Sequence, residues 1–171
     1  MNIFPLPTGI VAVTGDEQTG KTTLLRQISG NLPHAHTQPH AIWLDLSLPE
    51  LDAHTPLEVW QELCMQYPSW QDDWQTDWID ALQLSPHLDK KLFMLSTGSR
   101  RKVALVGMLC SGAAITCIDQ PYVALDQASV RVLREFLTDM AEHPTRTWVV
   151  ADYEADPNLP WQQVIALPLA T

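Results

Sequence analysis

A nine-residue segment near the amino terminus constrains the fold of this chain more than any other feature. Residues 15–23 have the sequence GDEQTGKTT; an apolar, β-rich run at 10–14 precedes them, and helix-forming residues at 21–30 overlap and follow. The pattern G-x-x-x-x-G-K-[ST] between a strand and a helix is typical of a loop that binds phosphate groups. The candidate binding residues are Gly15, Asp16, Glu17, Gln18, Thr19, Gly20, Lys21, Thr22 and Thr23.

The residue types in this loop suit a purine nucleoside triphosphate such as ATP, bound with magnesium. Gly15 and Gly20 permit a close approach of the backbone that a Cβ would prevent. The amides between them form a nest for anionic oxygens at a helix start. We expect Lys21 to neutralise the β- and γ-phosphates and Thr22 to offer its hydroxyl to Mg²⁺. The alternative is a glycine-rich turn that matches the pattern by chance.

An acidic residue further along the chain is the second expected magnesium ligand. The largely apolar run at 115–118 ends in Asp119, and P-loop proteins hold Mg²⁺ with a carboxylate at the end of such a strand. The alternative role of Asp119 is to cap the next turn. Gln120 follows directly, and its amide cannot accept a proton. It therefore cannot replace the glutamate that many ATPases place there as a general base, a function worth about 10²–10⁴ in rate.

Apolar runs that alternate with helical segments predict an α/β fold. The expected strands are 10–14, 41–46, 114–119, 146–151 and 163–167, and the expected helices include 21–30, 100–110 and 126–142. This alternation favours a mostly parallel sheet flanked by helices. We expect a loop at 31–40, whose histidines (His34, His36 and His40) are more simply solvated than bound to a metal.

The chain length of 171 residues suits one domain, 1–171, with a helical insertion. Tryptophans, glutamines and acids at helical spacing predict a helical subdomain at 55–95, between the core segments 1–54 and 96–171. Trp70, Trp74 and Trp78 recur every four residues and therefore share a helix face. We favour a place for these rings in the subdomain core; the alternative is an aromatic surface for a partner.

Net charge and cysteine content indicate which partners and which cellular compartment to expect. The chain has 20 Asp and Glu against 10 Lys and Arg, a formal net charge of −10 that argues against a nucleic-acid-binding face. No apolar run approaches the roughly 18 residues of a membrane helix, so we expect no direct membrane insertion. Three widely spaced cysteines and no secretory signal indicate reduced thiols in the cytoplasm.

The order of motifs resembles the ATP-binding subunits of ABC transporters. The likeness rests on GKTTLLRQISG at 20–30, the helical insertion before Leu95, LSTGSRRKVAL at 95–105, CIDQPYVALD at 117–126 and TWVVAD at 147–152. LSTGS is similar to the family's signature LSGGQ, and CIDQPYVALD to its Walker B strand and D-loop. Within the family, the chain looks most like the ATP-binding subunits of bacterial haem exporters used in cytochrome c maturation.

The resemblance implies a P-loop NTPase fold of the ABC-ATPase type, with a RecA-like α/β core and a site shared by two subunits. In such a head-to-tail pair, Ser96 and Gly98 would contact the γ-phosphate held by the partner subunit's Lys21, and Asp126 would lie at the interface. The alternative for LSTGS is a plain helix N-cap. The implied partners are a second ATP-binding subunit, identical or different, and a transmembrane subunit that holds the protein at the inner face of the membrane.

Several positions depart from the family pattern. The switch histidine appears as Asp152, whose carboxylate would repel a γ-phosphate, and Gln120 stands in place of the catalytic glutamate. The signature glutamine appears as Ser99, and residues 46–48 lack the Q-loop glutamine. Only 14 residues precede Gly15, so we expect most of the family's antiparallel β subdomain and its adenine-stacking aromatic to be missing.

Together these departures predict a degenerate ABC-type ATPase that binds MgATP with weak or absent hydrolysis. Phe4 could stack on the base, although a core or flanking contact is its favoured role. One alternative is a pseudo-ATPase that acts as a regulatory or binding module. The other is an unrelated P-loop nucleotide-binding enzyme, such as a small kinase, against which the signature-like segment weighs.

Overall fold

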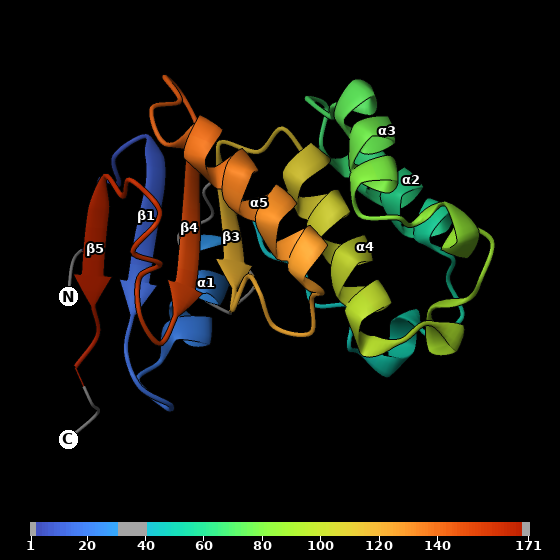
Figure 1. The fold of residues 1–171 in the computed structure, drawn as a ribbon, viewed down its shortest axis with the longest axis horizontal. Coiled ribbons are helices and arrows are strands. Elements are labelled where there is room, and N and C mark those ends of the chain that lie inside the picture. The colour runs from blue at the N-terminus through green and yellow to red at the C-terminus, as the bar shows by residue number, and fades with distance from the viewer. Residues whose placement is uncertain (1–2, 31–40, 169–171) are drawn as a thin grey trace. The chain divides into compact units, whose positions relative to one another are not determined.

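Five parallel strands form the sheet that carries the phosphate-binding loop (Figure 1). The computed structural model describes residues 3–30 and 41–168, so the predicted loop at 31–40 with its three histidines lies outside the described residues. All strand pairings are parallel, which confirms the predicted α/β fold. The strands are β1 (Gly9–Thr14), β2 (Ala41–Ile42), β3 (Ile115–Asp119), β4 (Thr147–Asp152) and β5 (Gln163–Ala166), in the order β2-β3-β4-β1-β5.

Continuous apolar runs explain why β1 and β4 lie inside the sheet. Residues 10–13 of β1 are at most 1% exposed, and residues 148–151 of β4 at most 4%. A parallel strand covered on both faces needs such a run. In Figure 1, α1 (Lys21–Ile28) lies behind the sheet and the carboxyl-terminal half of α5 (Gln127–Met140) lies in front of it. Phe136 of α5 packs edge-on against Trp148, with ring centroids 5.8 Å apart.

The chain divides into two compact units. Unit 1 comprises the described residues within 1–43, 114–121 and 133–171 and contains the sheet; unit 2 comprises 44–113 and 122–132. Unit 2 holds α2 (Pro56–Gln66), α3 (Asp72–Ala81), α4 (Thr97–Cys110) and the short 3-10 turns η1 (Pro49–Leu51), η2 (Ser85–His87) and η3 (Leu92–Met94). Within 3–30 and 41–168, no helix combines the length and the hydrophobicity needed to cross a bilayer. The predicted subdomain limits, 55–95 between 1–54 and 96–171, stay a prediction.

Capping residues stabilise the starts of α2 and α4 in unit 2. Thr55 and Glu58 form a reciprocal capping box at the start of α2, with Pro56 at the first helical position. Ser96 caps α4 by accepting a hydrogen bond from the Ser99 amide at 3.1 Å. Because of this cap, α4 begins three residues before the predicted start at residue 100.

The second strand is shorter than predicted. β2 spans Ala41–Ile42, whereas the apolar run indicated a strand over 41–46. Soon after the strand, the Asp45 carboxylate accepts hydrogen bonds from the amide and the hydroxyl of Ser47, at 2.9 and 2.6 Å. Such local side-chain contacts compete with the ladder hydrogen bonds of a sheet. The described pairing of β2 with β3 covers residues 41 and 42, although most residues up to 46 are apolar.

Tryptophan side chains contribute to the core of unit 2. Trp60 of α2 is 1% exposed and donates a hydrogen bond from Nε1 to the Val103 carbonyl of α4 at 3.0 Å. Trp78 of α3 is 6% exposed, whereas Trp70 and Trp74 are half-buried. The core role favoured for the repeated tryptophans thus holds for Trp78, and the other two keep part of their surface accessible.

We expect Trp60→Ala to destabilise the protein strongly, because replacing a buried aromatic ring by alanine typically costs about 3–5 kcal/mol. Urea unfolding followed by circular dichroism measures the change. Met65→Ala is the control, since Met65 lies on the same helix and is 73% exposed; we expect it to change stability by no more than about 0.5 kcal/mol. A similarly small effect of both substitutions would contradict the core position of Trp60.

Candidate nucleotide-binding site

The loop at 15–23 runs from the end of β1 into the start of α1, as its motif predicts. Gly20 precedes α1 with a φ of 89°, a left-handed conformation that glycine adopts without strain. At Gly15, a Cβ would lie 2.6 Å from Thr19 Oγ1. Both motif glycines are therefore required by the path of the loop, which ends at a helix N-terminus suited to anions.

Lys21 is held by the loop itself. The residue is 8% exposed, and its Nζ donates hydrogen bonds to the carbonyl oxygens of Gly15 at 2.5 Å and Asp16 at 2.7 Å. Nζ also lies 4.9 Å from the centroid of the Tyr153 ring, within the range of a cation–π interaction. These contacts fix one positive charge in the loop where phosphate groups are expected.

Thr22 and Asp119 bring two oxygen ligands together from distant parts of the chain. The Thr22 hydroxyl donates to Asp119 Oδ2 at 2.5 Å, although 97 residues separate them. Oxygen ligands fit Mg²⁺, which usually takes one or two carboxylates together with phosphate oxygens and water. In the described part of the chain, no group of three or more His, Cys, Asp or Glu could hold a metal ion. A magnesium ion held by Thr22 and Asp119 would therefore need further oxygen ligands from a bound phosphate.

A pocket of about 380 Å³ opens at this loop. It brings together most of the predicted phosphate-binding residues and both predicted metal ligands. Its lining consists of Glu17, Gln18, Gly20, Lys21, Thr22, Thr23, Asp119, Gln120 and Tyr153. Asp16 and Thr19 support the loop instead, because the Thr19 hydroxyl donates to the Asp16 carbonyl at 2.9 Å.

Tyr153 lines this pocket, although the motifs pointed to its neighbour Asp152. Among the described residues that form the lining, Asp152 is absent; its carboxylate accepts a hydrogen bond from the Tyr153 amide at 2.8 Å. The Tyr153 hydroxyl donates to Glu17 Oε1 at 3.0 Å. The only sequence signal for Tyr153 was its place directly after β4, because ligands bind beyond the carboxyl ends of parallel strands.

Gln120 lies beside Asp119 at the end of β3. Its backbone amide donates to the Ala151 carbonyl at 2.7 Å, and its φ of 45° turns the chain away from the strand. The side chain lines the pocket. A carboxamide at this place can hydrogen-bond to water or phosphate, but it cannot take up a proton.

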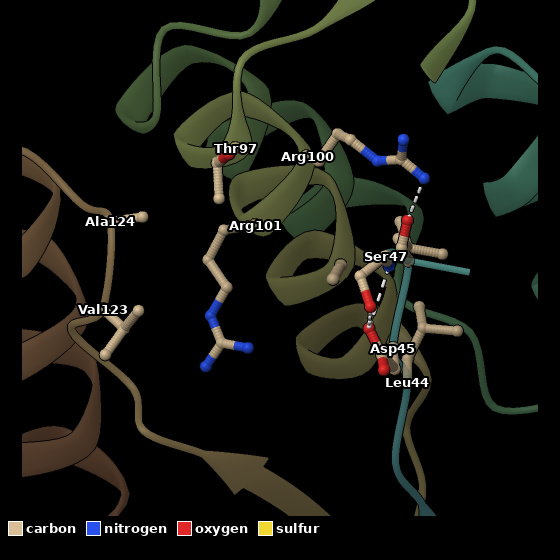
Figure 2. Close-up of a pocket in the computed structure, with 10 residues that line it drawn as sticks. Leu44, Asp45, Ser47, Thr97, Arg100, Arg101, Val123 and Ala124 are labelled. Carbon is tan, nitrogen blue, oxygen red and sulfur yellow. Dashed lines mark hydrogen bonds between the residues drawn. The ribbon is translucent and has the colours of Figure 1, made fainter. Parts of the chain in front are cut away.

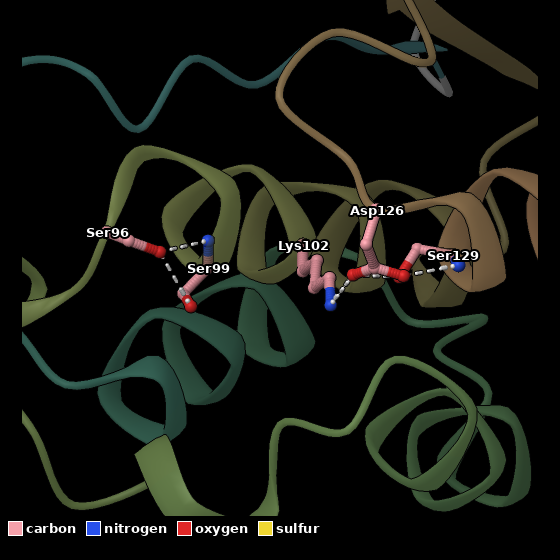
Figure 3. Close-up of polar contacts among 5 residues, drawn as sticks. All are labelled: Ser96, Ser99, Lys102, Asp126 and Ser129. Atoms are coloured by element: carbon pink, nitrogen blue, oxygen red, sulfur yellow. Dashed lines mark hydrogen bonds and ion pairs between the residues drawn. The ribbon is translucent and has the colours of Figure 1, made fainter.

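The signature-like segment belongs to unit 2 and forms the first turn of α4 (Figure 3). The Ser96 hydroxyl accepts from the Ser99 amide and donates to the Ser99 hydroxyl, each at 3.1 Å. A Cβ on Gly98 would lie 2.5 Å from the Ala124 carbonyl oxygen, so this position requires glycine. The helix-cap role of Ser96 is therefore observed, and Ser96 and Thr97 remain exposed at a helix N-terminus.

Asp126 is fixed by contacts within unit 2 (Figure 3). Its Oδ2 lies 2.7 Å from Lys102 Nζ, and the carboxylate accepts from the Ser129 amide at 2.9 Å and the Ser129 hydroxyl at 3.0 Å. The hydrogen bond from Lys102, followed by that from the Ser129 amide, lowers the pKa of Asp126. The carboxylate is therefore ionised at neutral pH and caps the first turn of α5.

A second pocket, of about 400 Å³, lies in unit 2 (Figure 2). Its lining is largely apolar but includes two arginines: Leu44, Asp45, Leu46, Ser47, Thr97, Arg100, Arg101, Ala104, Val123 and Ala124. Arg100 is paired with Asp52 at 2.7 Å and donates to the Leu46 carbonyl. Figure 2 shows the Arg101 side chain extending away from Arg100. The segment at 46–48, which lacks the Q-loop glutamine, contributes Leu46 and Ser47 to this pocket.

Comparison with known proteins identifies ATP-binding proteins among the relatives of this chain. The family model for the ABC transporter domain matches residues 6–123. The cytochrome c biogenesis ATP-binding export protein CcmA of Zymomonas mobilis subsp. mobilis is 33% identical over 135 residues, 74% of this chain and 58% of that protein. The thiamine import ATP-binding protein ThiQ of Histophilus somni is 29% identical over 134 residues, 68% of this chain and 63% of that protein. The chain thus spans less than two thirds of the length of either relative.

Solved structures share the fold. A chain from Pyrococcus furiosus described as an ABC transporter ATP-binding protein superposes with a TM-score of 0.72 at 21% identity, covering 96% of this chain and 92% of that one. A bacterial ABC transporter cassette solved as a dimer superposes with a TM-score of 0.66 at 20% identity, covering 87% and 78%. The structural likeness supports the fold, and the family model matches more than half of the sequence. The chain therefore belongs to the ABC transporter family of ATP-binding proteins.

Proposed function

We propose that this chain is the ATP-binding subunit of an ABC-type transporter, and that it binds MgATP at a head-to-tail dimer interface with weak or absent hydrolysis. The observation that carries the proposal is the convergence of Lys21, Thr22 and Asp119 in one pocket. Lys21 supplies a positive charge held in the loop, and the other two supply paired oxygen ligands. Membership of the family favours ATP as the nucleotide.

Each group in the pocket has a distinct task in this proposal. Lys21 exchanges the carbonyls of Gly15 and Asp16 for β- and γ-phosphate oxygens. Thr22 and Asp119 would hold a magnesium ion, which when bound would offset negative charge on the phosphates. The Gln120 amide can orient a water molecule but cannot deprotonate it. Turnover is therefore slow, because the missing base alone is worth about 10²–10⁴ in rate.

The second half of the site comes from a partner subunit in this proposal. Ser96 and Gly98 form the first turn of a 14-residue helix, where partial positive charge favours anions. Ser96 is exposed, and a relative of the same fold was solved as a dimer. We place Ser96 and Gly98 against the γ-phosphate bound by the partner subunit's Lys21, with Asp126 at the same interface.

A transmembrane transporter subunit is the second proposed partner. The names of the relatives refer to export in cytochrome c biogenesis and to thiamine import, and a transport complex accounts for both. Binding to that subunit holds the chain at the cytoplasmic face of the membrane. The net charge of −10 gives no support to a nucleic-acid partner.

A pseudo-ATPase that acts as a regulatory or binding module is the second candidate. Gln120 favours it, because the pocket holds a carboxamide where a base is needed. Both candidates bind MgATP, and they differ in turnover. An assay of ATP hydrolysis alongside nucleotide titration distinguishes them.

Lys21→Ala is expected to weaken MgATP binding at least about tenfold, since a hydrogen bond to a charged group contributes roughly 1.5–3 kcal/mol. Isothermal titration calorimetry measures the affinity. Lys90→Ala is the control, because it removes the same charge from an exposed position in unit 2. Equal affinity of the wild type and Lys21→Ala would contradict the assignment of the pocket.

Ser96→Asp tests the dimer without removing the helix cap, because aspartate caps helices as well as serine. Its added negative charge would face the γ-phosphate of the partner subunit and repel it. We expect MgATP to dimerise the wild type but not Ser96→Asp, measured by light scattering, while circular dichroism and the nucleotide affinity of the monomer stay unchanged. Dimerisation of the variant would contradict the proposed contact. A wild type that remains monomeric with MgATP would indicate pairing with a different subunit.

Gln120→Glu is expected to raise the rate of ATP hydrolysis by about 10²-fold or more, because it introduces the missing proton acceptor. Gln120→Asn is the control, since it keeps an amide and supplies no base. Phosphate release under saturating MgATP measures the rate. No gain in the glutamate variant would mean that the missing base does not limit turnover, and that Asp152 or the absent Q-loop glutamine also blocks hydrolysis.

A further inference from the structure

Tyr153 contacts other residues that line the pocket at the 15–23 loop. Its hydroxyl donates to Glu17 of the loop at 3.0 Å, and its ring lies 4.9 Å from Lys21 Nζ. The hydrogen bond to Glu17 raises the pKa of Tyr153, an effect that a side-chain hydrogen bond with Gln120 partly offsets. The phenol therefore remains protonated at neutral pH and joins the loop to the residue that follows β3.

The phenol lies in the pocket where one end of a nucleotide is expected. Thr22 and Asp119 mark the proposed magnesium site, and magnesium in P-loop proteins contacts the β- and γ-phosphates. Tyr153 shares the pocket with this pair and with Gln120, the residue directly after Asp119. Among the phosphates of a nucleotide seated on Lys21 and the magnesium ligands, the terminal one would lie nearest to Gln120 and Tyr153.

We propose that Tyr153 is a positioning residue that recognises the terminal phosphate and makes the site prefer a nucleoside triphosphate over a diphosphate. On binding, the hydroxyl exchanges the Glu17 carboxylate for a γ-phosphate oxygen. Both acceptors are anionic, so the exchange leaves the donor satisfied, and the displaced carboxylate of Glu17 faces solvent because that residue is exposed. This inference rests on the proposed function, since it concerns the same nucleotide.

The chemistry of the side chain suits this task. A phenol donates one hydrogen bond to an oxyanion without carrying a charge of its own. Its 45% exposure leaves the side chain free to adjust when the pocket is filled. A diphosphate lacks the terminal group, so the hydroxyl would stay on Glu17 and contribute nothing to affinity. The hydroxyl thus distinguishes the two nucleotides.

The test compares affinities for a non-hydrolysable MgATP analogue and for MgADP, by isothermal titration calorimetry of the full chain. We expect Tyr153→Phe, which keeps the ring over Lys21, to lose more than twofold in affinity for the triphosphate and less than twofold for the diphosphate. The loss is smaller than that of a whole charged hydrogen bond, because the hydroxyl of the free protein already donates to Glu17. Tyr67→Phe is the control, because it removes a phenol from unit 2. Glu17→Gln removes the competing carboxylate charge, and we expect it to raise the affinity for the triphosphate.

Each result bears on the inference. A loss in the triphosphate affinity alone, with a gain in Glu17→Gln, supports it. An equal loss for both nucleotides in Tyr153→Phe would overturn it in favour of a structural role, and unchanged affinities would overturn it outright. A wild type that binds neither nucleotide would instead overturn the proposed function, and the inference with it.

Discussion

The register between β1, β4 and β3 determines which side chains meet at the phosphate-binding loop. Thr14 pairs with Asp152, and Asp119 pairs with Ala151, so the carboxyl ends of all three strands lie at one edge of the sheet. A slip of one residue between β3 and β4 would turn the Asp119 side chain to the other face of the sheet, away from Thr22. The contact between Thr22 and Asp119, which joins α1 to β3, depends on this register.

Local sequence signals were enough to predict the position of the loop and to select Thr22 and Asp119, which the structure brings into contact. The remaining features depend on tertiary contacts. The glycines and Lys21 contact residues close in the sequence, and Asp119 stands at the end of an apolar run, so spacing along the chain was informative. The choice between Asp152 and Tyr153 depends on how the chain turns after β4, which residue types do not specify. The length of β2 was overestimated because hydrophobicity persists to residue 46, whereas pairing with β3 covers two residue positions.

Residues of the signature-like segment (95–99) and of the D-loop-like segment that ends at Asp126 make structural contacts within the chain. Ser96 caps α4, Gly98 admits the Ala124 carbonyl, and Asp126 both caps α5 and pairs with Lys102. These contacts explain why Ser96, Gly98 and Asp126 occupy their positions, without reference to a partner subunit. The case for an interface therefore rests on what these contacts leave exposed at the start of α4, together with family membership, and the capping role is compatible with it.

The carboxamide of Gln120 affects how long two subunits would stay paired around a bound nucleotide. In a site that cleaves its ligand quickly, the time for which two subunits stay together is set by the chemical step. With an amide in place of a base, that time would be set by dissociation of the ligand instead. The fraction of sites that hold a triphosphate would then follow the ratio of triphosphate to diphosphate in solution. The lifetime of the paired state would depend on this ratio and not on the rate of hydrolysis.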